Sequence, residues 1–437
     1  MEQDEKSRFS FASIAISFFV LIVLPLTITG IVISRGVVKV GEDATQASLR
    51  ILDDTQKQCI EQRAENVAEA VAQFLAGRQR DIRIAAILPR TVDAYSTFLV
   101  SNTRGVLRSS DIGNVKVPEA VYREIAFLDK DGMETLKVTV DGIVSSDALV
   151  DMSVPSNGAY GSEGYFIKAK GLAPGEFYMG PVTGAHVNRE QVASGKTFDG
   201  IIRMATPVFD SNGFAGVVEL TMNAVHLMEF TDNIVPTEPG RLFADVAMAD
   251  DNYAYMVGGD GFIISHPADY LIKGIGDDMQ PVETMTEDNY TTLIKTGSGA
   301  MNLREMGFMD ENLPRMDALA SEGKSGSLTY IRDNARIFAV YAAIPYFSGG
   351  FVKPAGFGWI GMVVDVDKYH HLSQEKVADI QEKVARWQRS SIVVVIVSLV
   401  LLFLIALILS RGIYRQILSA QKDPGAPGDY PEDEDKD

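Results

Sequence analysis

The sequence lacks the residue patterns on which most catalytic sites depend. Its 437 residues include five histidines and one cysteine, and none of the motifs GxSxG, GxxxxGK[ST], HExxH or CxxC occurs. The histidines are scattered, and the adjacent pair His370–His371 would point in different directions on a helix. We therefore expect no metal, no cofactor and no enzymatic activity. An extracytoplasmic hydrolase is the remotest function considered, because no nucleophile–base pair can be proposed.

A surplus of basic residues is also absent, and so is any disulfide within the chain. Lys and Arg number 40 against 58 Asp and Glu, which gives a net charge of −18 and argues against a nucleic-acid partner. Cys59 is the lone cysteine and cannot form an intramolecular disulfide. We expect it to be a small packed residue of a helix, and the alternative is a thiol available for an intermolecular link.

Charge is missing altogether from two long apolar runs. They span residues 9–34 and 391–410, and each reaches the roughly 20 apolar residues that a helix needs to cross a bilayer. The first run exceeds the apolar core of a signal peptide, and no A-x-A-like cleavage site follows it. Both runs are therefore predicted transmembrane helices, with the lipid bilayer as a partner of the protein.

The charges that flank the two spans are nearly balanced between the two sides. Lys6 precedes the first span and Arg411 follows the second, as expected for cytoplasmic ends, but Arg35 and Arg389 border the spans on the other side. Two spans place both termini on one side, and a large domain is translocated regardless of its charge. We expect a two-pass protein of the inner (plasma) membrane, with cytoplasmic termini (1–8 and 411–437) and a periplasmic or extracellular domain.

A long amphipathic helix is predicted for residues 35–90. Its apolar residues recur at spacings of three and four, which is typical of one helix face: Ala64, Val67, Ala68, Val71, Phe74 and Leu75. Pro89 ends the pattern. Because a helix of this length rarely stands alone, we expect it to pack on its own domain or on a second copy of the chain.

Strand-like segments joined by tight turns begin at about residue 118. One pair, Ile125–Leu128 and Thr135–Val140, flanks a Lys-Asp-Gly turn. Similar pairs recur within residues 201–220, 252–267 and 326–367, and helical segments are expected near 163–169, 224–231 and 283–295. This order predicts an α+β fold with two antiparallel-sheet modules, at residues 91–235 and 236–370. A connecting helix at 371–390 then leads into the second span, and the acidic, Pro/Gly-containing end of the tail is expected to be disordered.

Residues of the kind that bind small ligands gather between Tyr160 and Thr206. Aromatic rings exclude water around the apolar body of a ligand, and an arginine can hold a carboxylate through two hydrogen bonds. The alternative is that the aromatic residues belong to the core and the arginines, Arg189 among them, make surface ion pairs. The residues we predict to bind a ligand are Tyr165, Phe166, Tyr178, Arg203, Thr206 and, just upstream, Asp151.

Two stretches, residues 164–182 and 198–220, resemble the ligand-binding module of double Cache sensor domains, the PAS-like extracytoplasmic domains of bacterial chemoreceptors and sensor kinases. The matching segments are Tyr165–Phe166, Pro174–Tyr178, Arg203–Asp210 and Gly213–Val218. Three later segments are similar to the second, membrane-proximal module: Asp260–Pro267, Gly323–Pro345 and Gly358–Tyr369. The resemblance covers roughly residues 36–385, and the order and spacing of the segments are more specific than any one of them.

The resemblance implies a membrane-distal module that binds an amino acid, organic acid, amine or related metabolite. It also implies a homodimer with the long helices side by side, in which ligand binding shifts the helices that enter the membrane. Many such domains carry an arginine two residues before the Tyr-Phe pair, which helps to hold a ligand carboxylate, whereas this chain has Glu163. An amine or an uncharged ligand therefore becomes more plausible, although Arg203 still supplies a cation.

The output domain that usually follows such a sensor is not recognisable after the second span. We therefore expect the sensor to signal through a separate membrane partner of the histidine-kinase or chemoreceptor type, or to have lost its output domain. The leading hypothesis is a membrane-anchored sensor of a small solute. The alternative is a non-sensing interaction or assembly subunit, also anchored in the membrane, that uses a Cache-like fold.

Overall fold

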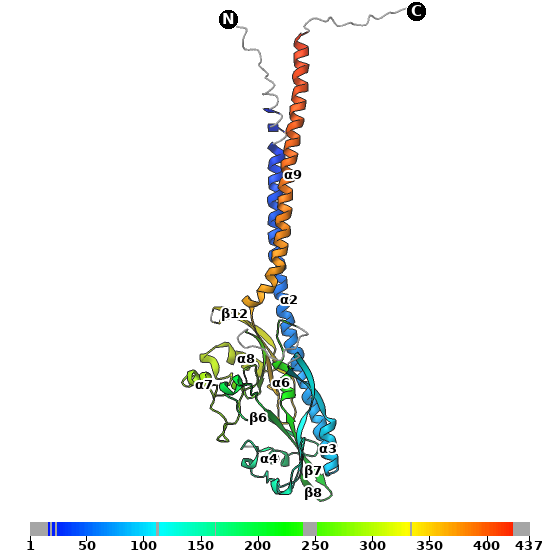
Figure 1. Cartoon of the computed structure of the whole chain (residues 1–437), viewed down its shortest axis with the longest axis vertical. Helices are drawn as coiled ribbons and strands as arrows, with labels where there is room; N and C mark the ends of the chain where they lie inside the picture. The colour runs from blue at the N-terminus through cyan, green and yellow to red at the C-terminus, as the bar shows by residue number, and fades with distance from the viewer. Residues whose placement is uncertain are drawn as a thin grey trace, which may run out of the picture. The chain divides into compact units, whose positions relative to one another are not determined.

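The computed structural model describes residues 16–17, 20–21, 24–110, 113–161, 163–238, 251–332 and 334–422. Residues 54–370 form one compact unit, and the two ends of the chain, up to residue 53 and from residue 371, form the other. Figure 1 follows the chain through its helices and strands.

The described helices differ widely in length, from the two long helices α2 and α9 to short connecting ones. They are α2 (Leu24–Ile87), α3 (Val92–Ser101), α4 (Tyr165–Lys170), α5 (Arg189–Ala193), α6 (Val225–Asp232), α7 (Tyr290–Thr296), α8 (Asn312–Ser321) and α9 (Val366–Lys422). The described strands are β1 (Thr103–Ser110), β2 (Gly113–Ala120), β3 (Tyr122–Asp129), β4 (Glu134–Thr139), β5 (Gly142–Ile143), β6 (Tyr178–Gly184), β7 (Gly200–Asp210), β8 (Gly213–Asn223), β9 (Asn252–Gly258), β10 (Ile263–Ser265), β11 (Gly326–Arg332), β12 (Ala335–Ile344) and β13 (Gly358–Asp365).

A six-stranded antiparallel sheet is built from the first half of the large unit. Its strand order is β5-β4-β3-β8-β7-β6, which leaves β6 at one edge. The central pair β3–β8 runs from Tyr122↔Met222 to Asp129↔Gly216. Because successive side chains of a strand point to opposite faces, each strand of this sheet contributes residues to two different layers.

One face of the six-stranded sheet is apolar and shares a core with α2. Ile125 of β3, Ile202 of β7 and Leu220 of β8 are fully buried in this core. The predicted apolar stripe of the long helix joins them, since Ala64, Ala68, Val71 and Leu75 are buried there and Val67 and Phe74 pack against them. The expectation that this helix packs on its own domain is therefore confirmed.

The opposite face of the same sheet combines a smaller core with charged residues. Ala126, Leu128, Ala205 and Val217 pack there against Tyr165 and Phe166 of α4. By strand alternation, Arg203 of β7 and Glu219 of β8 point to this face as well. The candidate site described below lies on this side.

A five-stranded sheet follows in the second half of the large unit, with the order β10-β9-β13-β12-β11 and antiparallel pairing throughout. Its central strand β13 carries Trp359, which is 1% exposed. The indole Nε1 donates to Oδ1 of Asp317 on α8 at 2.9 Å, so this helix is held against the sheet.

The four predicted strand pairs are all present. The turn between β3 and β4 shows why this pair is predictable from sequence. Oδ1 of Asp129 accepts hydrogen bonds from the backbone N–H groups of Asp131, Gly132 and Met133 at 2.9–3.1 Å. Gly132 has φ +103°, a conformation that favours glycine. The β3–β4 hairpin is thus closed by the residues of the predicted turn.

Several elements differ from the sequence-based expectation. The β1–β2 hairpin at residues 103–120 was not expected, because strands were expected only from about Pro118, a residue that lies near the end of β2. Strand β6 and helices α3, α5 and α8 were also missed, and α7 begins at Tyr290 and not near residue 283. β6 reads YMGPVTG, where two glycines and a proline hide the strand pattern. Cys59, expected to be packed, is exposed.

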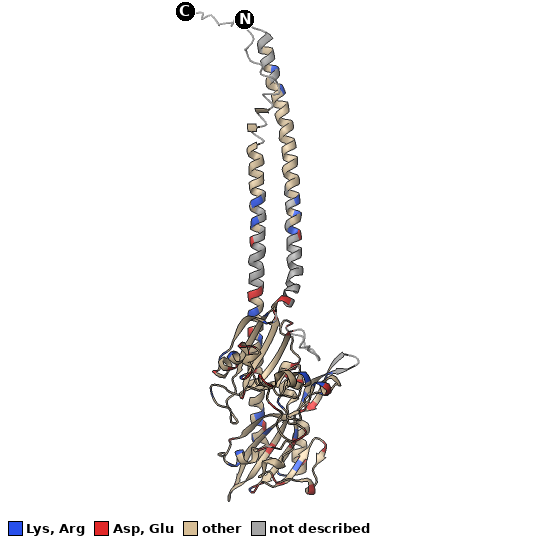
Figure 2. Ribbon diagram, turned by 90° about the vertical axis from the view of Figure 1, so that its left-hand side faces the viewer, with Lys and Arg blue, Asp and Glu red and all other residues tan. Residues whose placement is uncertain are grey.

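The unit formed by the chain ends consists of parts of α2 and α9. Both views show these two helices side by side (Figures 1 and 2), and a Cβ on Gly30 would lie 3.5 Å from a methyl group of Val395. Figure 2 also shows a long stretch of α9 without charged residues.

Among the described residues, one helical segment, Ala385–Ile413, is long and apolar enough to cross a membrane, and Leu24–Ile33 is a shorter apolar helix. The predicted span 391–410 lies inside the first of these. Residues 9–15, 18–19 and 22–23 of the other predicted span lie outside the described residues, as do the termini 1–8 and 423–437. The two-span arrangement and the disordered tail therefore stay predictions.

Candidate functional site

A cavity of about 580 Å³ lies between the two halves of the large unit. One wall comes from the six-stranded sheet and α4, with Tyr160, Glu163, Tyr165, Tyr178 and Arg203 among its residues. The other wall comes from the second half, at residues 258–260, 262, 273–275, 350–352 and 355–357. The volume falls in the range of small-molecule sites, roughly 300–1,000 Å³.

Strand β6 forms the boundary of the cavity and is held at both of its ends by the second half of the chain. At one end, Met179 N donates to Gly349 O at 2.8 Å. At the other, Ile275 N donates to Gly184 O at 2.8 Å and His186 N donates to Ile275 O at 2.9 Å. The residues between these clamps, 180–183, all line the cavity. The wall is therefore held in place by backbone hydrogen bonds from both directions.

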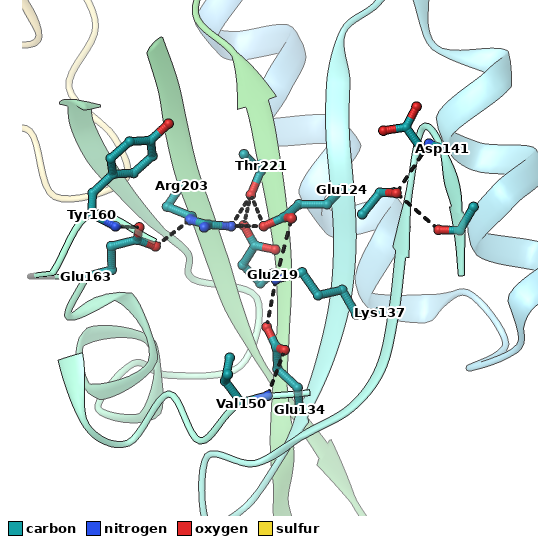
Figure 3. Close-up of polar contacts among 12 residues, drawn as sticks. Glu124, Glu134, Lys137, Asp141, Val150, Tyr160, Glu163, Arg203, Glu219 and Thr221 are labelled. Atoms are coloured by element: carbon teal, nitrogen blue, oxygen red, sulfur yellow. Dashed lines mark hydrogen bonds and ion pairs between the residues drawn. The ribbon is translucent and has the colours of Figure 1, made fainter. Parts of the chain in front are cut away.

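A buried ion cluster, which we call the Arg203 network, lies on the first wall (Figure 3). Arg203 Nε donates to Glu163 Oε2 at 2.7 Å, and Nη1 donates to Glu219 Oε1 at 3.1 Å. The same Nη1 also bonds Glu124 and, at 2.5 Å, the hydroxyl of Thr221. Arg203 is 8% exposed and Glu219 is fully buried, so these charges are paired away from bulk water.

Strand alternation brings the network together. Arg203 on β7 is directly opposite Thr221 on β8, and Thr221 is directly opposite Glu124 on β3. Glu219 precedes Thr221 by two residues and so points to the same face. The third carboxylate that binds Arg203, Glu163, comes from the loop before α4 and is 7% exposed.

Lys137 and Glu134 of β4 extend the Arg203 network. Lys137 Nζ lies 3.0 Å from Glu134 Oε1 and 3.4 Å from Glu124 Oε2. Burial lowers the pKa of Lys137, but the attraction of Glu124 and Glu134 outweighs it and leaves the pKa raised. The network then contains four carboxylates, which are Glu124, Glu134, Glu163 and Glu219, against two cations. It carries an excess of negative charge when all six groups are ionised.

Protonation of Glu219 would reduce this excess negative charge. Burial raises the pKa of Glu219 to about 7, against the opposing pull of Arg203. Its Oε2 is buried without a hydrogen-bond partner among the described residues. For Glu124 burial also opposes ionisation, but Arg203 and Lys137 hold its pKa below the ordinary value. Of these two carboxyls, Glu219 is therefore the first to bind a proton as the pH falls.

Three tyrosines stand around the polar end of the cavity. The ring of Tyr165 lies 5.5 Å from the guanidinium carbon of Arg203, and burial raises the pKa of this phenol well above its ordinary value. Burial raises the pKa of Tyr160 and Tyr178 as well. All three hydroxyls thus stay protonated at neutral pH and can donate or accept hydrogen bonds, and their rings offer faces to a cation.

The structure places three of the six predicted residues, Tyr165, Tyr178 and Arg203, on the cavity wall. The other three are not among its lining residues. Phe166 packs in the core behind the wall, and Asp151 Oδ1 accepts from Ser153 N at 2.9 Å in a turn. Thr206 Oγ1 donates to Glu176 O at 2.7 Å. The role of all six as ligand contacts stays a prediction.

The alternative interpretation of the two arginines as surface ion pairs needs correction. The guanidinium of Arg203 is buried and is bound by three glutamates. Arg189 is exposed and away from the cavity lining, where its guanidinium lies 4.4 Å from the ring centroid of Tyr270 and donates to its hydroxyl.

Sequence reasoning missed the acidic partners other than Glu163, and it missed the whole second wall. Glu219 is the one charged residue in the apolar run GVVELTM, and Glu124 directly precedes another apolar run. A charged residue within or beside a predicted strand could therefore have indicated these two members of the network. No comparable signal marks Lys273, because only folding brings its loop to β6. In the part of the chain that the structure describes, no group of three His, Cys, Asp or Glu residues could hold a metal ion.

No family model matches the chain, and no curated protein matches it. Comparison with solved structures finds similarity to receptor ligand-binding domains. For that of the chemoreceptor CtaA of Pseudomonas fluorescens in complex with L-isoleucine, the identity is 16% and the TM-score 0.41, and the match covers 74% of this chain and 98% of that domain. Two further examples are ligand-binding domains of amino acid chemoreceptors of Pseudomonas aeruginosa PAO1. For PctC in complex with GABA, the identity is 13% and the TM-score 0.38, and the match covers 71% of this chain and 99% of that domain. For PctB in complex with L-Arg, the identity is 14% and the TM-score 0.38, and the match covers 74% of this chain and 93% of that domain.

Proposed function

We propose that the chain is a membrane-anchored, extracytoplasmic sensor that binds a small solute with an ammonium group, an amine or an amino acid. The observation that carries the proposal is a preformed cavity whose polar end meets the Arg203 network. In this network carboxylates outnumber cations, and Glu163 is one of the residues that line the cavity.

The charges favour a cation over a simple anion at this end. The guanidinium of Arg203 is already paired with Glu124, Glu163 and Glu219, so a ligand carboxylate would have to displace one of them. An ammonium group would instead add the missing positive charge beside Glu163, in a site where burial strengthens charge pairing. The rings of Tyr160 and Tyr178, which also line the cavity, can cover the ammonium by cation–π contact.

The signalling part of the proposal depends on the helices. The segment Ala385–Ile413 would anchor the protein in the bilayer together with the first apolar run. Ligand binding would shift the population of two arrangements of the large unit, and α2 and α9 would carry the shift across the membrane. We propose a homodimer that acts on a separate signalling protein of the histidine-kinase or chemoreceptor type.

Ligand-induced stabilisation of the full-length protein in lipid nanodiscs tests the binding proposal. Amines and amino acids are expected to raise the melting temperature, because a ligand that binds only the folded state stabilises it by mass action. Dicarboxylic acids without an amino group are expected to have no effect. Glu163→Gln should weaken the binding of amines about tenfold, since it removes one charge-assisted contact.

Glu176→Gln is the matched control, because this glutamate is exposed and is not a cavity residue. The melting temperature of each variant without ligand reports its folding. If neither amines nor amino acids stabilise the wild-type protein at millimolar concentration, the solute-sensing proposal is wrong. A stable complex with another membrane protein, in the absence of any ligand response, would then support the interaction-subunit alternative.

A further inference from the structure

The cavity has a second polar end, on the wall that comes from the second half of the chain. Its charged residues are Lys273 and Asp260, which lie in loops on either side of β10. They face the cavity together with Phe262. This end has a different charge balance from the Arg203 network.

Lys273 is poorly neutralised in its position. Its Nζ lies 4.0 Å from Asp260 Oδ2, the outer limit of an ion pair, and the two side chains are 38% and 51% exposed. An ion pair this long and this open to water contributes little. The ammonium also lies 3.9 Å from the ring centroid of Phe262, which orients it without using its hydrogen-bond donors.

The surface around these two polar ends is apolar. Val182 of β6 contributes to it from the first wall, and Ile264, Phe351 and Phe357 contribute from the second. A molecule that reaches both ends therefore needs an apolar body with a polar group at each end. An ammonium group suits the carboxylate-rich end, and an anionic group suits Lys273.

We propose that Lys273 binds the carboxylate of a zwitterionic ligand whose ammonium group lies at Glu163. The inference rests on the proposed function and narrows it from amines in general to amino acids whose two charged groups are separated by an apolar body. The ligand then contacts both halves of the large unit at once.

The position of Lys273 gives this contact a mechanical consequence. Ile275, two residues further on, makes the backbone hydrogen bonds that clamp the end of β6. A ligand that binds Lys273 and Glu163 adds a third connection across the same boundary, beside the two backbone clamps. Its binding therefore tightens the junction between the two sheets.

A homologous series of probes tests the inference with the full-length protein in nanodiscs. The zwitterions are the ω-amino acids from 3-aminopropanoate to 8-aminooctanoate, and each is paired with the alkylamine and the alkanoate of the same chain length. Isothermal titration calorimetry gives the dissociation constants. We expect an optimum chain length at which the ω-amino acid binds roughly tenfold more tightly than its alkylamine, the gain expected from one charge-assisted contact.

Two substitutions at Lys273 separate a binding role from a structural one. Lys273→Gln should abolish the tenfold advantage of the ω-amino acid and leave the affinity for the alkylamine within twofold. Lys273→Glu should reverse the preference, so that the α,ω-diamine of the best chain length binds more tightly than the ω-amino acid. Lys353→Gln is the matched control, because Lys353 also lies over a phenyl ring, that of Phe347 at 5.2 Å, but does not line the cavity.

The outcomes distinguish the two proposals. If alkylamines bind and no ω-amino acid binds more tightly than its alkylamine, or if Lys273→Gln weakens both equally, the role of Lys273 is disproved and the ammonium site stands. If none of the amines and ω-amino acids binds, the inference fails; if α-amino acids also fail to stabilise the protein, the proposed function fails with it.

Discussion

At the scale of single residues, the most unusual group is Glu219. It is a fully buried carboxyl whose neighbours in the Arg203 network include more carboxylates than cations. Such a network is costly in the folded protein, because each charge has left water and only partly recovers the loss by pairing. Networks of this kind are weak evidence for stability and better evidence for a site.

The pH dependence of stability should reveal this cost. The folded-state pKa of Glu219 is raised to about 7, so the stability that its protonated form contributes is fully present below about pH 4.5 and is lost as the pH rises through 7. We expect the unfolding free energy of the wild type to fall relative to that of Glu219→Gln over this interval, by on the order of 3 kcal/mol. Chemical denaturation at pH 4.5, 6, 7 and 8 measures the difference.

The comparison with a variant is needed because Glu124, whose pKa is lowered, titrates in the opposite sense. The control is Glu190→Gln, at an exposed position on α5, for which the difference from wild type should be the same at all four pH values. A flat profile for Glu219→Gln would mean that this carboxyl is ionised throughout the range.

At the scale of elements, β6 decides whether a cavity exists. β6 is an edge strand and has a sheet neighbour on one side only. Loops from the second half form backbone hydrogen bonds with its other side, at Met179 and Gly184. At the clamp near Gly184, the backbone of Gly274 must approach that of His186 closely, since a Cβ on Gly274 would lie 2.6 Å from the Cα of His186. That contact involves backbone atoms, which cannot move aside as a flexible side chain can.

Gly274→Ala should therefore separate the loop from β6. We expect a loss of about 1–3 kcal/mol in stability, as for other overpacked sites, and weaker binding of alkylamines and ω-amino acids because the two walls move apart. Thermal unfolding and calorimetric titration measure the two effects. Gly276→Ala is the control, since its Cβ would meet mainly the end of the flexible Asp278 side chain, at 3.0 Å. If Gly274→Ala and Gly276→Ala changed stability and ligand affinity equally, close packing of Gly274 against His186 would not be what holds the two walls together.

The same scale shows which elements the sequence reveals. Hairpins with Asp/Asn/Gly turns between alternating strands, such as β3–β4 and β7–β8, are visible because local turn chemistry and local patterning agree. β6 and the β1–β2 hairpin are not visible in this way. β6 is short of side chains that mark a strand, and its pairing depends on partners that are distant in the sequence.

At the scale of the whole molecule, the apolar helices and the lone cysteine allow a direct test of topology. Cys59 is exposed and belongs to the large unit, which we propose to lie outside the cytoplasm. A membrane-impermeant maleimide should therefore label the wild-type protein in right-side-out membrane vesicles, without lysis. Cys59→Ser should remove the label.

A second cysteine position makes the topology test reciprocal. In the Cys59→Ser background, Ser419→Cys places a thiol at an exposed position near the end of α9. It should react only after the vesicles are lysed, if the C-terminal end is cytoplasmic. Labelling of Cys59 that requires lysis would contradict the proposed orientation.

The sequence alone determined the two antiparallel sheets, the long helix with its apolar stripe and the apolar segment near the C-terminus, because each of these depends on periodicity or turn chemistry that is local in the chain. It also pointed to Tyr165, Tyr178 and Arg203. The tertiary structure decided what surrounds them. Pairing of β3, β7 and β8 brought Glu124 and Glu219 to Arg203, and the loop before α4 added Glu163. The loops of the second half brought Lys273 to the other wall of the cavity. Charge balance and cavity walls come from residues far apart in sequence, so only the folded chain contains them.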